Sequence, residues 1–211
     1  MDKLPKLPKE VWSALVGAFF DYGAVDKTIG ASFYFSAKKG WKIIVPSQVV
    51  SSCTMSSSFL RSRDLMTGEL YQFSSALSPS ILSPTSLVAS TEEPYQFPGA
   101  LPPLTLRRTS TKMSNDENYD FIGDAYSHNS MPPFFSSTTD RSELKIPGYY
   151  LSVGSFSRDS PSYQVMASKV KNGRRATIPA AEILEDPLAL PTRTYHSSIR
   201  ELITTVVLLQ K

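Results

Sequence analysis

The hydrophobic positions near the start of the chain follow a helical period. Apolar residues recur there at the i, i+1, i+4, i+5, i+8 and i+9 positions of one wide helical stripe: Val11, Trp12, Leu15, Val16, Phe19 and Phe20. This spacing predicts a helix of about three turns, which Gly23 can end. We expect the stripe to pack in a core. The alternative is that Trp12, Phe19 and Phe20 form an exposed partner-docking face.

A hairpin and then a weakly patterned stretch follow this helix. Residues 32–45 predict two strands joined by a turn at 37–40, and Pro46 is expected to end the second strand. From about 47 to 142 the chain is rich in Ser and Pro, and only a short ordered piece is expected, around residues 65–71. Ordering such a stretch costs roughly 1–2 kcal/mol of backbone entropy per residue. We therefore expect long, loosely structured loops there.

The pattern sharpens again after residue 145. Three segments with strand-like composition predict an antiparallel meander: 149–157, 162–170 and 174–178. Asn172-Gly173 lies between the last two and is the strongest hairpin signal in the chain, because both central residues of a type I′ turn need a positive φ.

The remaining C-terminal residues predict short helical pieces. Residues 180–184 suit one helical turn. Ser197 or Ser198 can cap a final amphipathic helix that continues to Leu209. The end of this segment, 204–209, is rich in β-branched residues, so a strand is the alternative there.

Together these elements predict a single α+β domain over residues 11–211, built from antiparallel hairpins, a meander, an N-terminal helix, a C-terminal helix and long Ser/Pro-rich loops. Antiparallel pairing should dominate, because no alternation of strands and helices occurs. Residues 1–10 precede the domain as a basic arm whose two prolines favour extended backbone. A length of 211 residues suits one ordinary domain.

Composition bears on the compartment. Cys53 is the only cysteine, so the chain can form no internal disulfide, and there is no Asn-x-Ser/Thr sequon. Both features favour an intracellular location, in the cytoplasm or associated with a virion or a membrane. The short apolar stretch near the start leads to no cleavage site, and no apolar run is long enough to span a bilayer. We expect neither a signal peptide nor a transmembrane segment.

The residues needed for common catalytic sites are missing from the sequence. Its glycines are too scattered for a phosphate-cradling loop, and the two histidines and one cysteine are too few and too far apart for a zinc site. No nucleophile-elbow motif occurs. A hydrolase based on Cys53 remains a weak alternative to an inert thiol. We therefore expect a protein that is not an enzyme and that holds no cofactor and no metal.

The net charge of +3 permits contact with phosphate groups without requiring it. Basic residues cluster around the Asn172-Gly173 turn and in the arm, where they could contact RNA or lipid headgroups; the alternative is solvated turns. These candidate contacts are Lys3, Lys6, Lys9, Lys169, Lys171, Arg174 and Arg175. The two arginines before Thr109-Ser110 also suit a basophilic kinase, which makes Ser110 a candidate phosphosite.

These features favour a non-enzymatic structural or assembly protein that binds copies of itself and contacts RNA or a membrane surface. Its composition is similar to that of small viral matrix and capsid proteins, although no shared motif supports the analogy. The alternative is a regulatory adaptor, of viral origin on the same analogy, that docks host proteins through short linear motifs. Its motifs would be residues 101–104, residues 119–122 and the Ser110 site.

Overall fold

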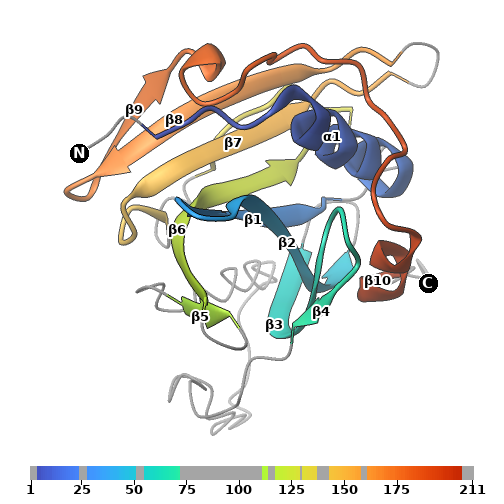
Figure 1. Cartoon of the computed structure of the whole chain (residues 1–211). Coiled ribbons are helices and arrows are strands. Elements are labelled where there is room, and N and C mark those ends of the chain that lie inside the picture. Colours follow the sequence, from blue (N-terminus) through green and yellow to red (C-terminus); the bar gives the residue numbers. More distant parts are fainter. Residues whose placement is uncertain are drawn as a thin grey trace, which may run out of the picture.

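Strands form most of the structure, and helix contributes a smaller part (Figure 1). The computed structural model describes residues 4–23, 28–50, 55–71, 111–113, 117–128, 130–136, 143–157 and 161–205. Its helical elements are α1 (Lys9–Gly23) and the short 3-10 helices η2 (Ala180–Glu182) and η3 (Ser197–Leu202). Its strands are β1 (Gly30–Ser36), β2 (Gly40–Val50), β3 (Met55–Asp64), β4 (Leu70–Tyr71), β5 (Thr111–Met113), β6 (Glu117–Ser127), β7 (Gly148–Gly154), β8 (Gln164–Lys171), β9 (Arg174–Ile178) and β10 (Ile203–Thr205).

The strands build one mixed sheet in the order β4-β3-β2-β1-β6-β7-β8-β9. β6 and β7 run parallel, as do β10 and β2, whereas the other pairings of described strands are antiparallel. The predicted predominance of antiparallel pairing is confirmed, but the sheet is not purely antiparallel.

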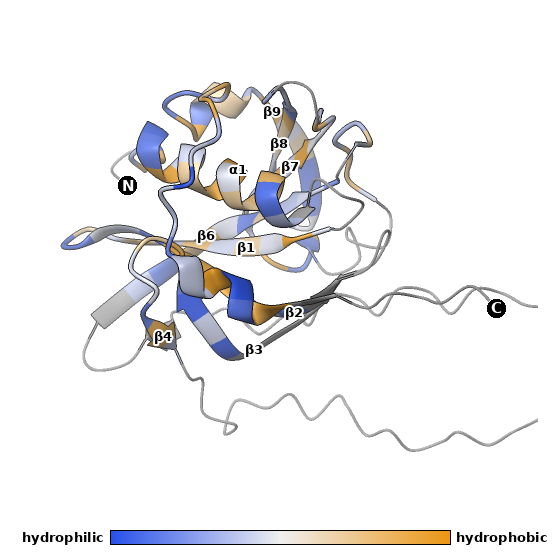
Figure 2. Cartoon of the chain, turned by 90° about the vertical axis from the view of Figure 1, so that its right-hand side faces the viewer, coloured by the Kyte–Doolittle hydropathy of each residue, from blue (hydrophilic) through white to orange (hydrophobic). Residues whose placement is uncertain are grey.

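Helix α1 packs on one face of this sheet, and the hydrophobic core lies between them (Figure 2). Strand residues that point towards the helix include Phe33, Ile43 and Leu151, all of which are buried. The helix predicted from the apolar spacing is confirmed, with its end at Gly23. Burying this stripe removes large apolar surfaces from water, which is the main stabilising contribution available to the fold.

The burial of α1 corrects the prediction of a docking face. Trp12 is 0% exposed and Phe19 is 1% exposed, so both side chains belong to the core. Phe20 is partly buried and packs edge-on against Phe156, with ring centroids 6.1 Å apart. Trp12 and Phe19 are therefore not available to a partner, and Phe20 is only partly exposed.

The predicted hairpin is present as β1 and β2, but the second strand does not end at Pro46. It continues to Val50, with a shift of register between Pro46 and Ser47. Such an irregularity accommodates a residue that has no N–H for the sheet ladder. The strand is therefore longer than its proline suggested.

Part of the middle of the chain is ordered, which corrects the prediction of loops from 47 to 142. β3 pairs with β2, and β6 lies between β1 and β7 in the sheet. Within the sheet, a strand from the middle of the chain therefore joins the N-terminal hairpin to the C-terminal meander. The short ordered piece expected around residues 65–71 is confirmed as a turn that leads into β4.

The C-terminal predictions agree with the structure except in the last segment. The meander is present as β7, β8 and β9, and the helical turn is η2. The last segment forms a short 3-10 helix followed by a strand rather than a long helix, and its N-cap is His196 rather than a serine. Residues 206–211 lie outside the described part of the chain.

The predicted N-terminal arm is tied to the body at one buried residue. Leu7 is 1% exposed, its N–H donates to the carbonyl of Ile183 at 2.7 Å, and its own carbonyl accepts from Glu185 N at 3.1 Å. Residues 4–8 therefore lie along the segment that follows β9. No helix in the described ranges is long and apolar enough to cross a membrane.

A buried polar node links α1 to the C-terminal segment. Trp12 Nε1 donates to the Tyr163 hydroxyl at 3.1 Å, and that hydroxyl lies 3.0 Å from the carbonyl oxygen of Pro187 and 2.8 Å from that of Ala189. Burial raises the pKa of Tyr163 to about 12, so the phenol keeps the proton that it donates. Each buried polar group here has a partner, which is the condition for burying it at low cost.

We expect Tyr163→Phe to lower the free energy of unfolding by about 1–3 kcal/mol, because the carbonyls of Pro187 and Ala189 lose their hydroxyl donor and the Trp12 N–H keeps only its longer bond to Pro187 at 3.3 Å. Tyr149→Phe is the matched control: its partly buried hydroxyl has no hydrogen bond within the described residues, so its effect should stay within about 0.5 kcal/mol. Urea denaturation measures both variants. Equal losses in both would contradict this role of the node.

Candidate functional site

The hairpin formed by β8 and β9 carries the densest group of basic residues in the described chain. Its turn has φ values of 52° at Asn172 and 72° at Gly173, as the sequence predicted. The register pairs Lys171 with Arg174 and Val170 with Arg175. Because directly paired residues of two strands point to the same face of a sheet, this register decides which cations lie together.

Arg174 and Arg175 therefore lie on opposite faces of the hairpin. Lys171 and Arg174 share one face with Lys169, which is two residues earlier on β8. This is the face on which α1 packs, because Ala167 of β8 belongs to the same core as the helix. Arg175 faces the other way, together with Ser168.

The environment of Arg175 corrects its prediction as a phosphate contact. Its guanidinium forms an ion pair with Glu143 and donates to the hydroxyl of Ser168. It also lies over the rings of Phe135 and Tyr150, at 4.1 and 5.3 Å from their centroids. The two charged side chains are only 13% and 8% exposed. Arg175 therefore holds residues 143–147 and 130–136 against the sheet and is not open to a ligand.

The other three cations of the hairpin are exposed. Lys169 Nζ lies 5.0 Å from the ring centroid of Tyr149, the residue opposite it on β7. Lys171 and Arg174 make no ion pair with any described residue. We call Lys169, Lys171 and Arg174 the basic face of the hairpin. Its position on a rigid two-stranded turn keeps three positive charges close together without a compensating carboxylate between them.

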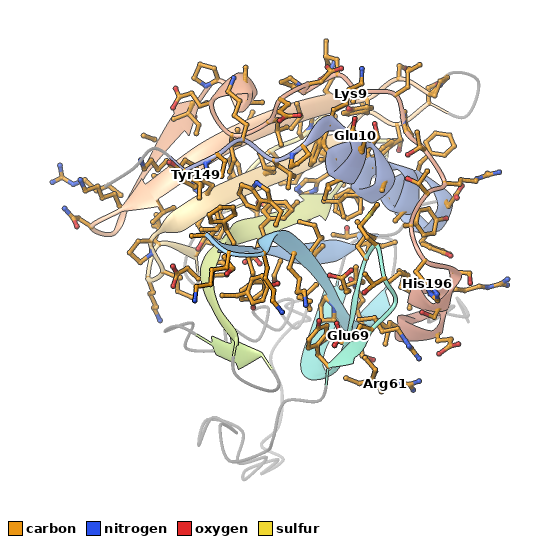
Figure 3. The ribbon with its side chains drawn as sticks, viewed as in Figure 1. Lys9, Glu10, Arg61, Glu69, Tyr149 and His196 are labelled. Atoms are coloured by element: carbon orange, nitrogen blue, oxygen red, sulfur yellow. The ribbon has the colours of Figure 1, made fainter. Side chains whose placement is uncertain are left out.

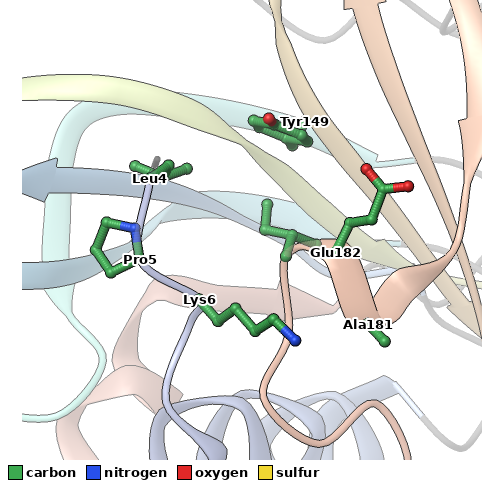
Figure 4. A pocket seen from close by; sticks show the side chains of 7 residues that line it. Leu4, Pro5, Lys6, Tyr149, Ala181 and Glu182 are labelled. Atoms are coloured by element: carbon green, nitrogen blue, oxygen red, sulfur yellow. The ribbon is translucent and has the colours of Figure 1, made fainter. Parts of the chain in front are cut away.

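A cleft lies beside the basic face (Figure 4). It has a volume of about 310 Å³ and is lined by residues 4–6, Tyr149 and residues 181–183. Two of its lining residues are charged, Lys6 and Glu182, and Tyr149 provides an aromatic wall. The cleft joins the N-terminal arm to the sheet, so the arm contributes Lys6 to the same side of the molecule.

The other predicted contacts differ in their availability. Lys9 Nζ pairs with Asp186 at 3.0 Å, and the hydrogen bond from this lysine lowers the pKa of the carboxyl. The positive charge of Lys9 is therefore already partly compensated by Asp186. Lys3, Ser110 and Cys53 lie outside the described residues.

A second group of polar side chains lies on the face of the sheet away from α1. The ammonium of Lys42 bonds the Tyr71 hydroxyl and lies 4.6 and 5.0 Å from the ring centroids of Tyr71 and Tyr119. Tyr71 in turn donates to Glu69, whose carboxylate is 3.6 Å from Lys42 Nζ. Burial raises the pKa of both tyrosines, as does the charge of Glu69, so these phenols stay protonated and are poor general bases. No sequence pattern indicated this cluster, because Lys42, Tyr71 and Tyr119 come from three different strands.

Among the residues that the structure describes, no group of three or more His, Cys, Asp or Glu side chains is arranged to hold a metal ion. Comparisons with protein-family models, with curated proteins and with solved structures found no match to this chain. The basic face and its adjacent cleft are thus the candidate site that the geometry supports best.

We expect Arg175→Gln to lower the free energy of unfolding by about 3 kcal/mol, because it removes one partner of the buried Arg175–Glu143 ion pair. Arg174→Gln, one residue earlier, should change it by no more than about 0.5 kcal/mol. Chemical denaturation of the two variants tests this directly. If both were equally stable, the assignment of the two arginines to opposite faces would be wrong.

His128 provides a second, pH-dependent test of the same region. It is 8% exposed, stacks on Phe134 with a centroid distance of 4.0 Å, and its Nε2 bonds the Phe134 carbonyl oxygen at 3.0 Å. Burial lowers the pKa of His128 below its ordinary value of 6.5, so the folded state favours the neutral ring. The unfolded chain then binds the proton more readily, and stability should fall as the pH drops below that value.

We expect His128→Gln to lose less stability than the wild type between pH 7.5 and pH 5, about the range over which a free imidazole titrates. The control is Gln164→Asn at an exposed position of β8, which removes no titrating group and should keep the wild-type pH dependence. Urea denaturation across this range provides the measurement. An unchanged pH slope in His128→Gln would contradict the buried neutral ring.

Proposed function

We propose that this chain is a non-enzymatic assembly protein that associates with itself and binds phosphate groups of RNA or of lipid headgroups through the basic face. The observation that carries the proposal is the arrangement of Lys169, Lys171 and Arg174, three exposed cations on one face of a rigid hairpin. Phosphate-bearing surfaces attract such a face from solution, and salt weakens the attraction.

The size of this attraction suits a weak, reversible contact. Each lysine or arginine near an anionic membrane contributes about 1 kcal/mol, so three of them give roughly a hundredfold preference for a charged surface over a neutral one. Lys6 at the cleft and Tyr149 beside Lys169 extend the face towards the N-terminal arm. The composition, similar to that of viral matrix and capsid proteins, fits a role in which many weak contacts act together.

The adaptor hypothesis receives less support from the structure. Tyr119, in one of its proposed docking motifs, is 3% exposed and packs in a cluster with Tyr34 and Ile44. That motif is part of β6, where only Asp120 of its four residues is exposed, so it does not present a free linear segment to a partner. The other two motifs, at 101–104 and Ser110, lie outside the described residues.

The test is the triple variant Lys169→Gln, Lys171→Gln, Arg174→Gln. We expect its affinity for vesicles of phosphatidylserine and phosphatidylcholine, or for a structureless RNA, to fall by roughly a hundredfold at low salt. Flotation measures binding to the vesicles, and filter binding measures binding to the RNA. The ligand whose affinity falls in the triple variant identifies the source of the phosphate groups. Vesicles of phosphatidylcholine alone should bind neither protein.

The matched control removes the same charge elsewhere. Lys38, Lys39 and Arg200 are exposed residues away from the hairpin, at the β1–β2 turn and in η3. Their replacement by Gln should leave binding close to that of the wild type. If this control lost as much affinity as the triple variant, binding would depend on net charge alone. If neither lipid nor RNA bound the wild type, the phosphate-binding part of the proposal would fail.

A further inference from the structure

The segment that follows η2 presents two leucines to solvent. Leu188 is 71% exposed and Leu190 is 67% exposed, the highest values among the exposed large apolar residues of the described chain. They flank Ala189, which is 1% exposed, and prolines precede and follow the group. Isolated exposed leucines are ordinary, but two on one short segment form an apolar projection that a partner can cover. We call residues 186–191 the leucine loop.

The leucine loop is held rigidly from beneath. Tyr163 bonds the carbonyl oxygen of Ala189, and the N–H of Ala189 donates to the carbonyl of Asp186 at 3.2 Å. At its far end, Thr192 N donates to Ser13 O on α1 at 3.0 Å. A projection that is already fixed loses little entropy when it binds, so its apolar area contributes more fully to affinity.

The charges around the leucine loop are mainly negative. Glu10 and Glu185 are exposed and make no ion pair with a described residue, whereas the nearest cation, Lys9, is already paired with Asp186. Figure 3 shows Lys9 and Glu10 together at the start of α1. An anionic bilayer would be repelled by this surface, and a cationic protein surface would be attracted.

A recess with a different balance of charge is present on the same side of this chain. The cleft beside Tyr149 is lined by apolar side chains together with Lys6 and Glu182, and it lies next to Lys169. The residues that form its other wall, 181–183, come directly before the leucine loop, and Ile183 and Ala189 pack in the same core. Projection and recess are therefore neighbours, and at the recess the positive charges of Lys6 and Lys169 exceed the negative charge of Glu182.

We infer that two copies of the chain pair through this side, with the leucine loop of each copy entering the cleft of the other. In a dimer with a two-fold axis, both copies use the same surface patch. A leucine loop and a cleft that lie on one patch can then form the same contact twice. Leu188 and Leu190 lose their exposure to water, while Glu185 and Glu10 approach Lys6 and Lys169 of the second copy. This inference rests on the self-association part of the proposed function and names the surface that performs it.

Disulfide trapping between two populations provides a direct test. Both carry Cys53→Ser; one carries Leu190→Cys in the leucine loop, and the other carries Ala181→Cys in the cleft wall. We expect a mixed disulfide to form roughly tenfold faster or more than random collision allows, because the contact raises the effective concentration of the two thiols. Tags of different length on the two populations identify the mixed product.

The control population carries Leu70→Cys. Leu70 lies on β4, outside the leucine loop, and is 40% exposed. Mixing it with Ala181→Cys should give only the collision rate. The inference is overturned if Leu190→Cys and Leu70→Cys react with Ala181→Cys equally fast, or if Leu190→Cys couples mainly to itself, since that would place two leucine loops against each other.

Sedimentation velocity then separates this inference from the proposed function. We expect Leu188→Ser with Leu190→Ser to raise the dissociation constant of the pair by about tenfold or more, and Leu70→Ser to leave it unchanged. If the wild type associates and the leucine variant associates equally well, the inference fails while self-association stands. If the wild type remains monomeric at all concentrations, both fail, whereas phosphate binding by the basic face is judged by its own assay.

Discussion

The hydrogen bonds of Trp12 and Tyr163 join helix α1 to the segment that follows η2 on one face of the sheet. The indole N–H and the phenol are buried, so each must keep a partner, and the carbonyls of residues 187–189 supply the acceptors. Helix α1 can settle on the sheet only where Trp12 reaches this node. The same bonds turn the backbone so that Ala189 faces inward and its leucine neighbours face outward. The pairing of buried polar groups in the core thus determines the shape of the leucine loop at the surface.

The β8–β9 hairpin shows the same coupling between interior and surface. Alternation along β9 sends Arg175 into a pocket of Glu143 and aromatic rings, while Arg174 remains in solvent one residue away. The buried arginine fixes the hairpin against the loop that carries Glu143. The exposed cations are then held at constant spacing by a turn that cannot easily move. A rigid support of this kind is what lets a few charges act as a site rather than as a flexible tail.

Periodicity predicted the elements that depend on local pattern. The apolar spacing from Val11 to Phe20 gave α1, and Asn172-Gly173 gave the β8–β9 turn. Periodicity missed β6, a strand in the middle of the sheet that contains Gly123 and Asp124. Both residues oppose strand formation locally, but a Cβ at Gly123 would lie 1.6 Å from the carbonyl oxygen of Tyr149, and Asp124 accepts a bond from Ser32 at 2.6 Å. Contacts distant in sequence therefore override the local preference.

The candidate site was only partly predictable, again because contacts between residues distant in the sequence determine it. Counting basic residues around the turn located the hairpin, but only the register shows that Arg175 belongs to a buried pair and that Lys169 stands over Tyr149. Strand alternation alone could have separated the two arginines. The cleft could not have been found, because it forms where the arm, β7 and the residues after β9 meet, and these segments are far apart in the sequence.

Self-association and phosphate binding reinforce each other because the inferred pair engages Lys6 and Lys169 and leaves Lys171 and Arg174 of each copy exposed. A single basic face with three exposed cations binds weakly, as the modest net charge of +3 implies. A two-fold pair carries Lys171 and Arg174 twice on one rigid body, and simultaneous contact with one surface raises overall affinity by about a hundredfold or more without any new interaction. The apolar contact between copies need not touch phosphate, and the basic face need not be strong. A chain with few charges can thus bind to a phosphate-bearing surface once it has assembled with a second copy.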